Sequence, residues 1–157
     1  MMLMGIDSST PQSSVALVKD GRIVDQAEVN VNATFSNQIL ALIDKVLVTS
    51  GTKLEDLDGF CLTTGPGSFT GLRVGASVLK GLLLVTSKPF VKIDTLEATA
   101  LRSMPTKKNI CAILDAKKKE VYTACFQPNS ETLERLTPDR AITPEQLCGE
   151  IKGPTVF

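Results

Sequence analysis

The segment at residues 65–73, Gly-Pro-Gly-Ser-Phe-Thr-Gly-Leu-Arg, most constrains how this chain can fold. The apolar run at 60–64 is typical of a short buried strand, and apolar residues at helical spacing follow from about residue 69 to residue 85. The pattern therefore predicts a strand that ends at a Gly-Pro-Gly turn and leads directly into a long helix.

Such a turn leaves several backbone N–H groups unpaired at the start of the helix. Ser68 and Thr70 are the candidate capping residues, and Gly65 and Gly67 permit the positive φ angles that a tight turn can require. Converging amides and the helix dipole also favour a bound anion. The spacing matches neither the phosphate loop Gly-x4-Gly-Lys-Ser/Thr nor the dinucleotide fingerprint Gly-x-Gly-x-x-Gly. A capped tight turn is the simpler interpretation, and an anion site stays open beside it.

The helix that follows is apolar around nearly its whole circumference. Its apolar residues form two stripes, Leu72, Ala76, Leu79 and Leu83 on one, and Val74, Val78, Leu82 and Val85 on the other. Small residues at 71, 75, 76 and 81 allow another backbone to approach closely. The helix is therefore either central to a core or has one stripe on the sheet and the other on a partner subunit. Arg73 and Lys80 argue against a membrane span.

The composition excludes several classes of function. Basic and acidic residues number 17 each in the 157-residue chain, so no overall positive charge attracts nucleic acid. The chain has no histidine, which excludes a Ser-His-Asp or Cys-His protease and disfavours a conventional zinc hydrolase. The four cysteines form no Cys-x-x-Cys pair, and no metal site is expected. Cys61, Cys111 and Cys125 fall in apolar strand-like runs, so they are expected to be buried free thiols. Because Met1 to Met4 leads into a strand rather than a signal peptide, we expect a cytoplasmic protein.

The N-terminal part has the pattern of an α/β unit. A buried strand at 3–7 ends in Asp7, and an Asp-Gly turn joins the next two strands. Apolar spacing predicts an amphipathic helix with Ile39, Leu40, Ile43, Val46 and Leu47 on one face. The remaining expected elements are strands at 13–18, 23–31, 57–64 and 90–93 and helices at 36–49, 69–85 and 95–102.

The C-terminal part repeats the opening of the N-terminal part. The strand expected at 110–115 again ends in a carboxylate, Asp115, and a second strand follows after a short turn at 120–126. A strand at 133–136, a helix capped by residues 143–145 and an apolar segment at 153–157 are also expected. This repeat indicates an internal duplication, with lobes at 1–104 and 105–157 and with the second lobe incomplete.

These features together resemble a known family. A strand-Asp-turn-strand opening in two lobes is similar to the actin, Hsp70 and sugar-kinase fold, a ribonuclease H-like α/β fold with a mixed sheet flanked by helices. Within that fold the turn at 65–73 is highly specific. It is accompanied by Gly-Ile-Asp-Ser-Ser at 5–9, Asp-Thr-Leu-Glu-Ala at 94–98, Leu-Asp-Ala at 114–116 and Glu-Val-Tyr at 120–122. Over essentially the whole chain, these motifs resemble the bacterial TsaB (YeaZ) family.

The resemblance implies a role in making the threonylcarbamoyladenosine modification beside the anticodon of tRNA. In that family the protein is generally not the catalyst. It pairs with the catalytic homologue TsaD, the pair works with the ATPase TsaE, and homodimers form through the same helical surface when TsaD is absent. The resemblance thus implies a pseudo-enzyme without catalytic residues that meets tRNA only through the complex. No cofactor is expected in the chain itself, and ATP or ADP at the partner interface stays open.

The resemblance also points to a contact surface. The turn and the helix behind it are expected to form the subunit contact, with Arg73 at its rim or reaching the partner's site. The first helix, around Ile39 and Ile43, is the second candidate. A bulky residue at Gly75 is expected to weaken pairing more than it weakens the monomer. The full set expected on the turn and its helix is Gly67, Ser68, Phe69, Thr70, Leu72, Arg73, Gly75, Ala76 and Leu79.

Asp7, Ser8, Ser9 and Asp115 are the expected remnants of a nucleotide site. ATPases of this fold hold phosphate with small or hydroxylated residues at both hairpin turns, and the aspartates help to place metal and water. The first turn keeps this chemistry, whereas the second has three lysines at 117–119, which favour a solvated tip over an anion site. Asp7 is either a turn-initiating carboxylate or a vestigial metal ligand. An ATP-dependent phosphoryl or carbamoyl transferase using Asp7 and Asp115 is therefore the alternative function.

Two departures from the family pattern are visible. Family members usually have His-Ser near the start of the first helix, where this chain has Phe35-Ser36. They are also usually longer, and this chain ends at Phe157 in what reads as the opening strand of a further unit. We expect a shortened chain, which puts in doubt a nucleotide site that needs the second lobe but not the helical surface of the first.

Overall fold

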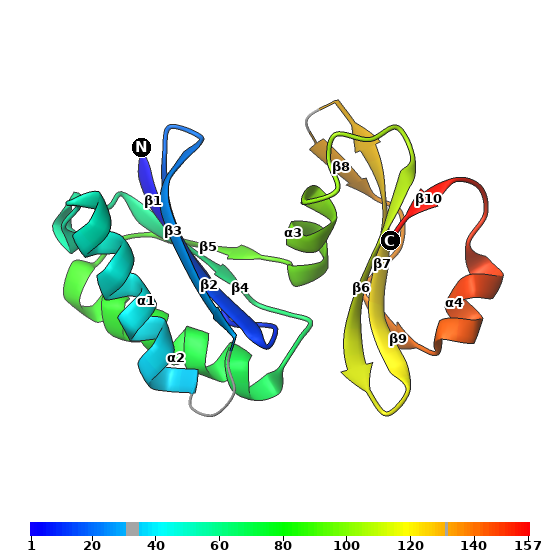
Figure 1. Cartoon of the computed structure of the whole chain (residues 1–157), viewed down its shortest axis with the longest axis horizontal. Coiled ribbons are helices and arrows are strands. Elements are labelled where there is room, and N and C mark those ends of the chain that lie inside the picture. The colour runs from blue at the N-terminus through cyan, green and yellow to red at the C-terminus, as the bar shows by residue number, and fades with distance from the viewer. Residues whose placement is uncertain (31–34, 131) are drawn as a thin grey trace. The chain divides into compact units, whose positions relative to one another are not determined.

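The computed structural model describes residues 1–30, 35–130 and 132–157 (Figure 1). They form two compact units, Met1–Ile93 and Asp94–Phe157. The boundary lies before the expected one at 104. Helix α3 (Thr95–Leu101) packs on strands β6 (Asn109–Lys117) and β7 (Glu120–Asn129), so it belongs to the second unit.

The first unit is built on a five-stranded mixed sheet in the order β3-β2-β1-β4-β5. Strands β1 (Met2–Asp7), β2 (Gln12–Lys19) and β3 (Arg22–Asn30) pair antiparallel. Strands β4 (Gly59–Thr63) and β5 (Phe90–Ile93) continue the sheet in parallel to β1. The β2–β3 turn has positive φ at Asp20 and Gly21, as its Asp-Gly pair predicts. The expected third strand is confirmed up to Asn30, and its last residue, Val31, lies outside the described residues.

Helices α1 (Phe35–Ser50) and α2 (Phe69–Thr86) lie on one face of this sheet (Figure 1). Side chains alternate along each strand, so every second residue of β1 and β2 faces the helices. A short 3-10 helix, η1 (Leu54–Asp56), which the pattern did not predict, leads from α1 towards β4. The buried core between sheet and helices includes Met4, Ile6, Val15, Leu17, Ile39, Ile43, Val46, Phe60, Leu62 and Leu79.

The second unit has a sheet in the order β10-β6-β7-β8, with β9 also paired to β7. Helix α3 packs on one face through Leu96 and Ala100, which contact a core of Ile110, Ala112, Ala124 and Phe126. Helix α4 (Pro144–Glu150) lies on the opposite face (Figure 1) and is capped by Thr143, as predicted. The remaining strands are β8 (Thr132–Arg135), β9 (Arg140–Ile142) and β10 (Thr155–Val156). Both units are therefore mixed sheets flanked by helices, as expected.

Candidate functional site

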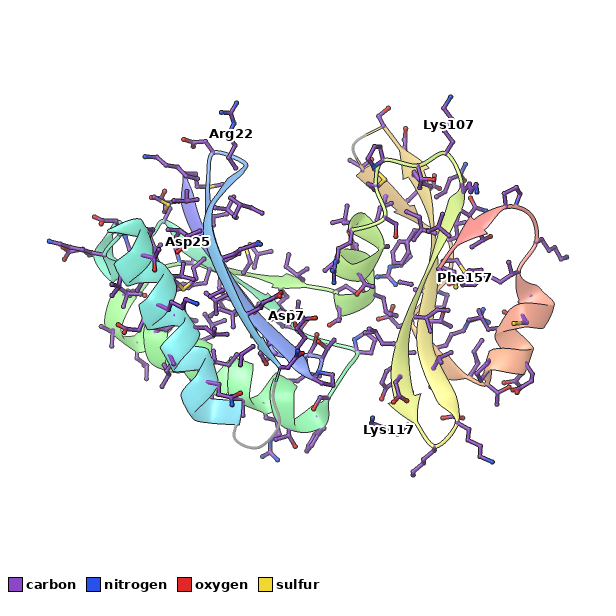
Figure 2. The ribbon with its side chains drawn as sticks, viewed as in Figure 1. Asp7, Arg22, Asp25, Lys107, Lys117 and Phe157 are labelled. Atoms are coloured by element: carbon purple, nitrogen blue, oxygen red, sulfur yellow. The ribbon has the colours of Figure 1, made fainter. Side chains whose placement is uncertain are left out.

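The carboxyl end of β1 and the turn after it form a hydrogen-bonded polar cluster around Asp7, which Figure 2 labels. Asp7 Oδ1 accepts hydrogen bonds from the Ser9 backbone N (2.9 Å) and from Ser9 Oγ (2.6 Å). It also accepts one from Thr63 Oγ1 (2.7 Å), at the end of the neighbouring strand β4. These bonds close the turn and join β1 to β4, which favours the turn-initiating interpretation of Asp7.

The two serine hydroxyl groups of this turn donate hydrogen bonds within the unit, whereas Thr10 Oγ1 donates to the Gln12 backbone oxygen at an exposed position. Ser8 Oγ donates a hydrogen bond to the backbone oxygen of Gly71 (2.9 Å), and Ser9 Oγ is bonded to Asp7. The Ser9 backbone oxygen accepts a hydrogen bond from the Ser68 N–H (2.6 Å). Both serines are buried. Three of the four expected remnants of a nucleotide site, Asp7, Ser8 and Ser9, thus form hydrogen bonds inside the first unit.

Three glycines spaced four residues apart bring the start of α2 onto this turn. A Cβ atom on Gly67 would lie closer than 3.0 Å to the Ser9 carbonyl oxygen, a separation that real Cβ atoms essentially never show. A Cβ on Gly71 would meet the Ser8 carbonyl oxygen equally closely, and one on Gly75 would meet Ser8 Oγ. The segment therefore requires glycine for space, because the turn and the helix approach each other at backbone distance.

The turn itself follows the sequence in part. Ser68 is the N-cap of α2, and its Oγ accepts a hydrogen bond from the Gly71 N–H (3.3 Å). Thr70, the second candidate, lies inside the first turn of the helix. Gly65 has a positive φ of 116°, as permitted, whereas Gly67 does not. The structure therefore supports a capped tight turn packed against its neighbour.

One face of α2 is exposed to solvent. We call it the exposed α2 face; it comprises Phe69, Thr70, Arg73, Ala76, Ser77, Lys80, Gly81, Leu84 and Val85. Its apolar ends are strongly exposed, with Phe69 at 73%, Leu84 at 78% and Val85 at 80%. The Arg73 guanidinium lies 5.1 Å from the centre of the Phe69 ring. Beside them runs a mainly apolar groove of about 360 Å³ that extends to Val74 and Val78.

Four of the expected contact residues are in the core instead. Ile39 is fully buried and Ile43 is 5% exposed, because both face the sheet from α1. Gly75 and Leu79 form the buried side of α2. These residues cannot form a surface contact in the folded unit. A bulky residue at Gly75 would clash with Ser8 Oγ inside the unit, so it is expected to disturb the monomer, and its effect on pairing stays a prediction.

The other expected residues divide between surface and turn. Phe69, Thr70, Arg73 and Ala76 are on the exposed α2 face, whereas Gly67, Ser68 and Leu72 are half-buried behind it. Sequence reasoning missed the exposed Leu40 and Val48 on α1, which packs beside α2. The side chains of Phe35 and Ser36 lie outside the described residues.

The length and mean hydropathy of α2, 1.4, would also suit a membrane span. In the first unit its buried side contacts the sheet through Gly71, Gly75 and Leu79. One such helix is weak evidence for a membrane span, because a core helix of a soluble protein passes the same test.

The second hairpin turn, between β6 and β7, has a different chemistry. Asp115 is exposed and accepts hydrogen bonds from the Lys117 backbone N (2.7 Å) and Nζ (2.9 Å), which lower the pKa of its carboxyl group. Lys117, Lys118 and Lys119 are exposed at the tip, each with a positive φ, and Figure 2 labels Lys117 there. The solvated tip expected from the three lysines is confirmed.

Comparison with solved structures defines the class of protein. The chain resembles YeaZ from Pseudomonas aeruginosa with a TM-score of 0.83 and 26% identity, over 91% of this chain and 68% of that one. It also resembles component A of (R)-2-hydroxyglutaryl-CoA dehydratase from Acidaminococcus fermentans, with a TM-score of 0.57 and 19% identity, over 92% of this chain and 48% of that one. The second likeness concerns the fold alone. The protein is therefore of the actin-like α/β class.

Sequence comparison gives the family. Residues 29–155 match the family model described as TsaD, tRNA N6-adenosine threonylcarbamoyltransferase. The tRNA threonylcarbamoyladenosine biosynthesis protein TsaB of Haemophilus influenzae is 36% identical over 126 residues, 78% of this chain and 52% of the relative. TsaB of Escherichia coli is 35% identical over 131 residues, which are 81% of this chain and 55% of the relative. The chain belongs to the TsaB (YeaZ) family, and it spans about half the length of the curated relatives it matches.

Proposed function

We propose that this chain acts in the biosynthesis of threonylcarbamoyladenosine in tRNA, as a non-catalytic subunit that pairs with a TsaD-like homologue. The names of its relatives support the pathway. The exposed α2 face is the single observation that supports pairing, because a stable unit rarely presents so much apolar helix to water.

The shape and chemistry of this face suit a helix from another subunit. Ala76, Ser77 and Gly81 are small and exposed at its centre, so a second helix can approach closely there. Arg73 and Lys80 lie among the apolar groups, where they can select a partner of opposite charge. Leu40 and Val48 are further exposed apolar residues on α1, which packs beside α2.

The two hairpin turns support the non-catalytic part of the proposal. In the first, the hydroxyl groups of Ser8 and Ser9 are hydrogen-bonded within the unit. In the second, Asp115 is paired with Lys117. Neither turn offers the free hydroxyl groups with which ATPases of this fold hold phosphate. In our proposal ATP chemistry therefore belongs to the TsaD-like and TsaE-like partners, and tRNA joins through the cytoplasmic complex.

Two matched arginine substitutions test the pairing surface. A Cβ at Gly81 of α2 and one at Gly149 of α4 would each meet no atom within 4 Å, and both positions are exposed on helices. We expect Gly81→Arg to raise the Kd for the purified TsaD homologue at least tenfold, about 1.4 kcal/mol. We expect Gly149→Arg to leave it unchanged. Isothermal titration calorimetry measures both, and urea unfolding checks that both monomers are intact.

Sedimentation and activity measurements extend this test. Without the TsaD homologue, we expect a homodimer that Gly81→Arg weakens. With TsaD, TsaE and tRNA, the chain should increase threonylcarbamoyladenosine formation, and alone it should not turn over ATP. If the two arginine variants bound the TsaD homologue with equal affinity, the exposed α2 face would not be the pairing surface. ATP turnover by the chain alone, abolished by Asp7→Asn, would favour the transferase alternative.

A further inference from the structure

Two cysteines lie directly opposite each other in the second unit. Strands β6 and β7 are antiparallel, and their register pairs Cys111 with Cys125. Directly opposed residues of an antiparallel pair have their side chains on the same face of the sheet. Here that face is the one opposite α3, because α3 packs on the alternate residues Ile110, Ala112 and Ala124.

The backbone hydrogen bonds show which kind of pair this is. The Cys125 N–H donates to Thr137 Oγ1 (2.9 Å), and the Cys125 carbonyl oxygen accepts from the Leu136 N–H (2.8 Å). Both backbone groups of Cys125 therefore point away from β6. This makes Cys111 and Cys125 a non-hydrogen-bonded pair, in which Cα atoms are about 4.5 Å apart and side chains are closest. That separation lies inside the range that a disulfide spans.

The two thiols differ in their surroundings. Cys111 is fully buried and its Sγ lies 3.2 Å from Thr123 Oγ1, whereas Cys125 is half-buried. Burial, together with the neighbouring Cys125 thiol, raises the pKa of Cys111 to about 11. Cys125 is thus the thiol that a small oxidant reaches first. Cys111, on the neighbouring strand, is the thiol that can then react with oxidised Cys125.

We propose that Cys111 and Cys125 form an oxidative modification site, at which a peroxide converts the two thiols into a cross-strand disulfide. The Cys125 thiolate attacks one oxygen of hydrogen peroxide, the O–O bond breaks, and Cys125 sulfenic acid and hydroxide form. Cys111 sulfur then attacks Cys125 sulfur, the S–O bond breaks, and the departing hydroxide takes the Cys111 proton. The hydroxide from the first step takes up the proton that the Cys125 thiol lost, so both thiols are oxidised, the peroxide is reduced, and two waters are released.

Peptide mapping of the full-length protein tests this inference. Trypsin cleaves at the lysines between the two strands, so Cys111 and Cys125 fall in separate peptides, 109–117 and 120–135. After peroxide treatment and alkylation of remaining thiols, we expect these peptides joined in the monomer, at a mass two hydrogens below their sum. The thermal unfolding midpoint of the oxidised protein should rise and return on reduction, because the crosslink restricts the unfolded chain.

Two serine variants supply the control. Cys125→Ser should leave Cys111 open to alkylation in denaturant, whereas Cys148→Ser, at an exposed position on α4, should form the crosslink as the wild type does. Separate, alkylated peptides 109–117 and 120–135 after peroxide treatment would overturn the inference. A crosslink that instead joins Cys148 to another molecule would overturn it as well. The wild-type map decides the question even if Cys125→Ser folds poorly.

Discussion

Gly71 lies where the backbone of α2 meets the backbone of the turn after β1. A Cβ there would approach the Ser8 carbonyl oxygen closer than 3.0 Å, and a backbone oxygen cannot rotate aside as the end of a side chain can. Gly71→Ala must therefore push α2 away from the turn and stretch the Ser8 hydrogen bond. We expect the free energy of unfolding to fall by about 2–3 kcal/mol, measured by urea denaturation.

Gly81 is the matched control in the same helix. A Cβ at this position meets no atom within 4 Å, so alanine there gains helix propensity without a clash. Gly81→Ala should raise the free energy of unfolding by about 0.5–1 kcal/mol. A similar loss in both variants would mean that backbone contact with the Ser8 turn is not what requires glycine at 71.

The side chain of Asp94 both caps the start of helix α3 and forms an ion pair with Arg135. Asp94 caps the helix, because its Oδ1 accepts a hydrogen bond from the Glu97 N–H (2.8 Å), and the same oxygen lies 2.9 Å from the Arg135 guanidinium. Burial alone would raise the pKa of Asp94, but these hydrogen bonds outweigh it and leave the pKa lowered. Burial and the nearby Asp94 raise the pKa of Asp139, which also pairs with Arg135.

The lowered pKa of Asp94 gives a pH dependence with a defined sign. A carboxyl group with a lowered folded pKa stabilises the protein above its unfolded pKa, about 3.9, and the gain is lost as pH falls through the folded value. Asparagine keeps the cap but not the charge. We expect Asp94→Asn to cost up to about 1 kcal/mol at neutral pH. Urea unfolding should show the two proteins converging below about pH 4, and a constant difference would contradict this.

Most elements of both units could be predicted, because strands alternate and helices repeat every three to four residues. The strand at Arg140–Ile142 and the short helix at Leu54–Asp56 could not, since three residues contain too little periodicity. The prediction of which side of α2 is buried was wrong for a different reason. The periodic pattern is read from apolar side chains, whereas the buried side of α2 is formed partly by Gly71 and Gly75, which have no side chain. Ile39 and Ile43 were expected at a partner contact because an apolar helix face fits a sheet and a partner subunit equally well, and the structure places both in the core.

At the scale of the whole molecule, the chain consists of two units with separate cores. Phe126 is fully buried in the second core, and its replacement by alanine should cost that unit about 3–5 kcal/mol. Hydrogen exchange should then show lost protection in β6 and β7 and unchanged protection in β1 and β4. Equal loss in both units would mean that they unfold as one.

The row of glycines at 67, 71 and 75 has a consequence for association. Backbone atoms, unlike side chains, have no rotamers, so a helix seated by backbone contact has little freedom to shift or tilt. The backbone positions of the residues on the exposed α2 face are consequently well defined. A partner that docks on α2 would therefore meet a helix backbone that is already ordered, and the conformational entropy lost on this side of the contact would be mainly that of the exposed side chains.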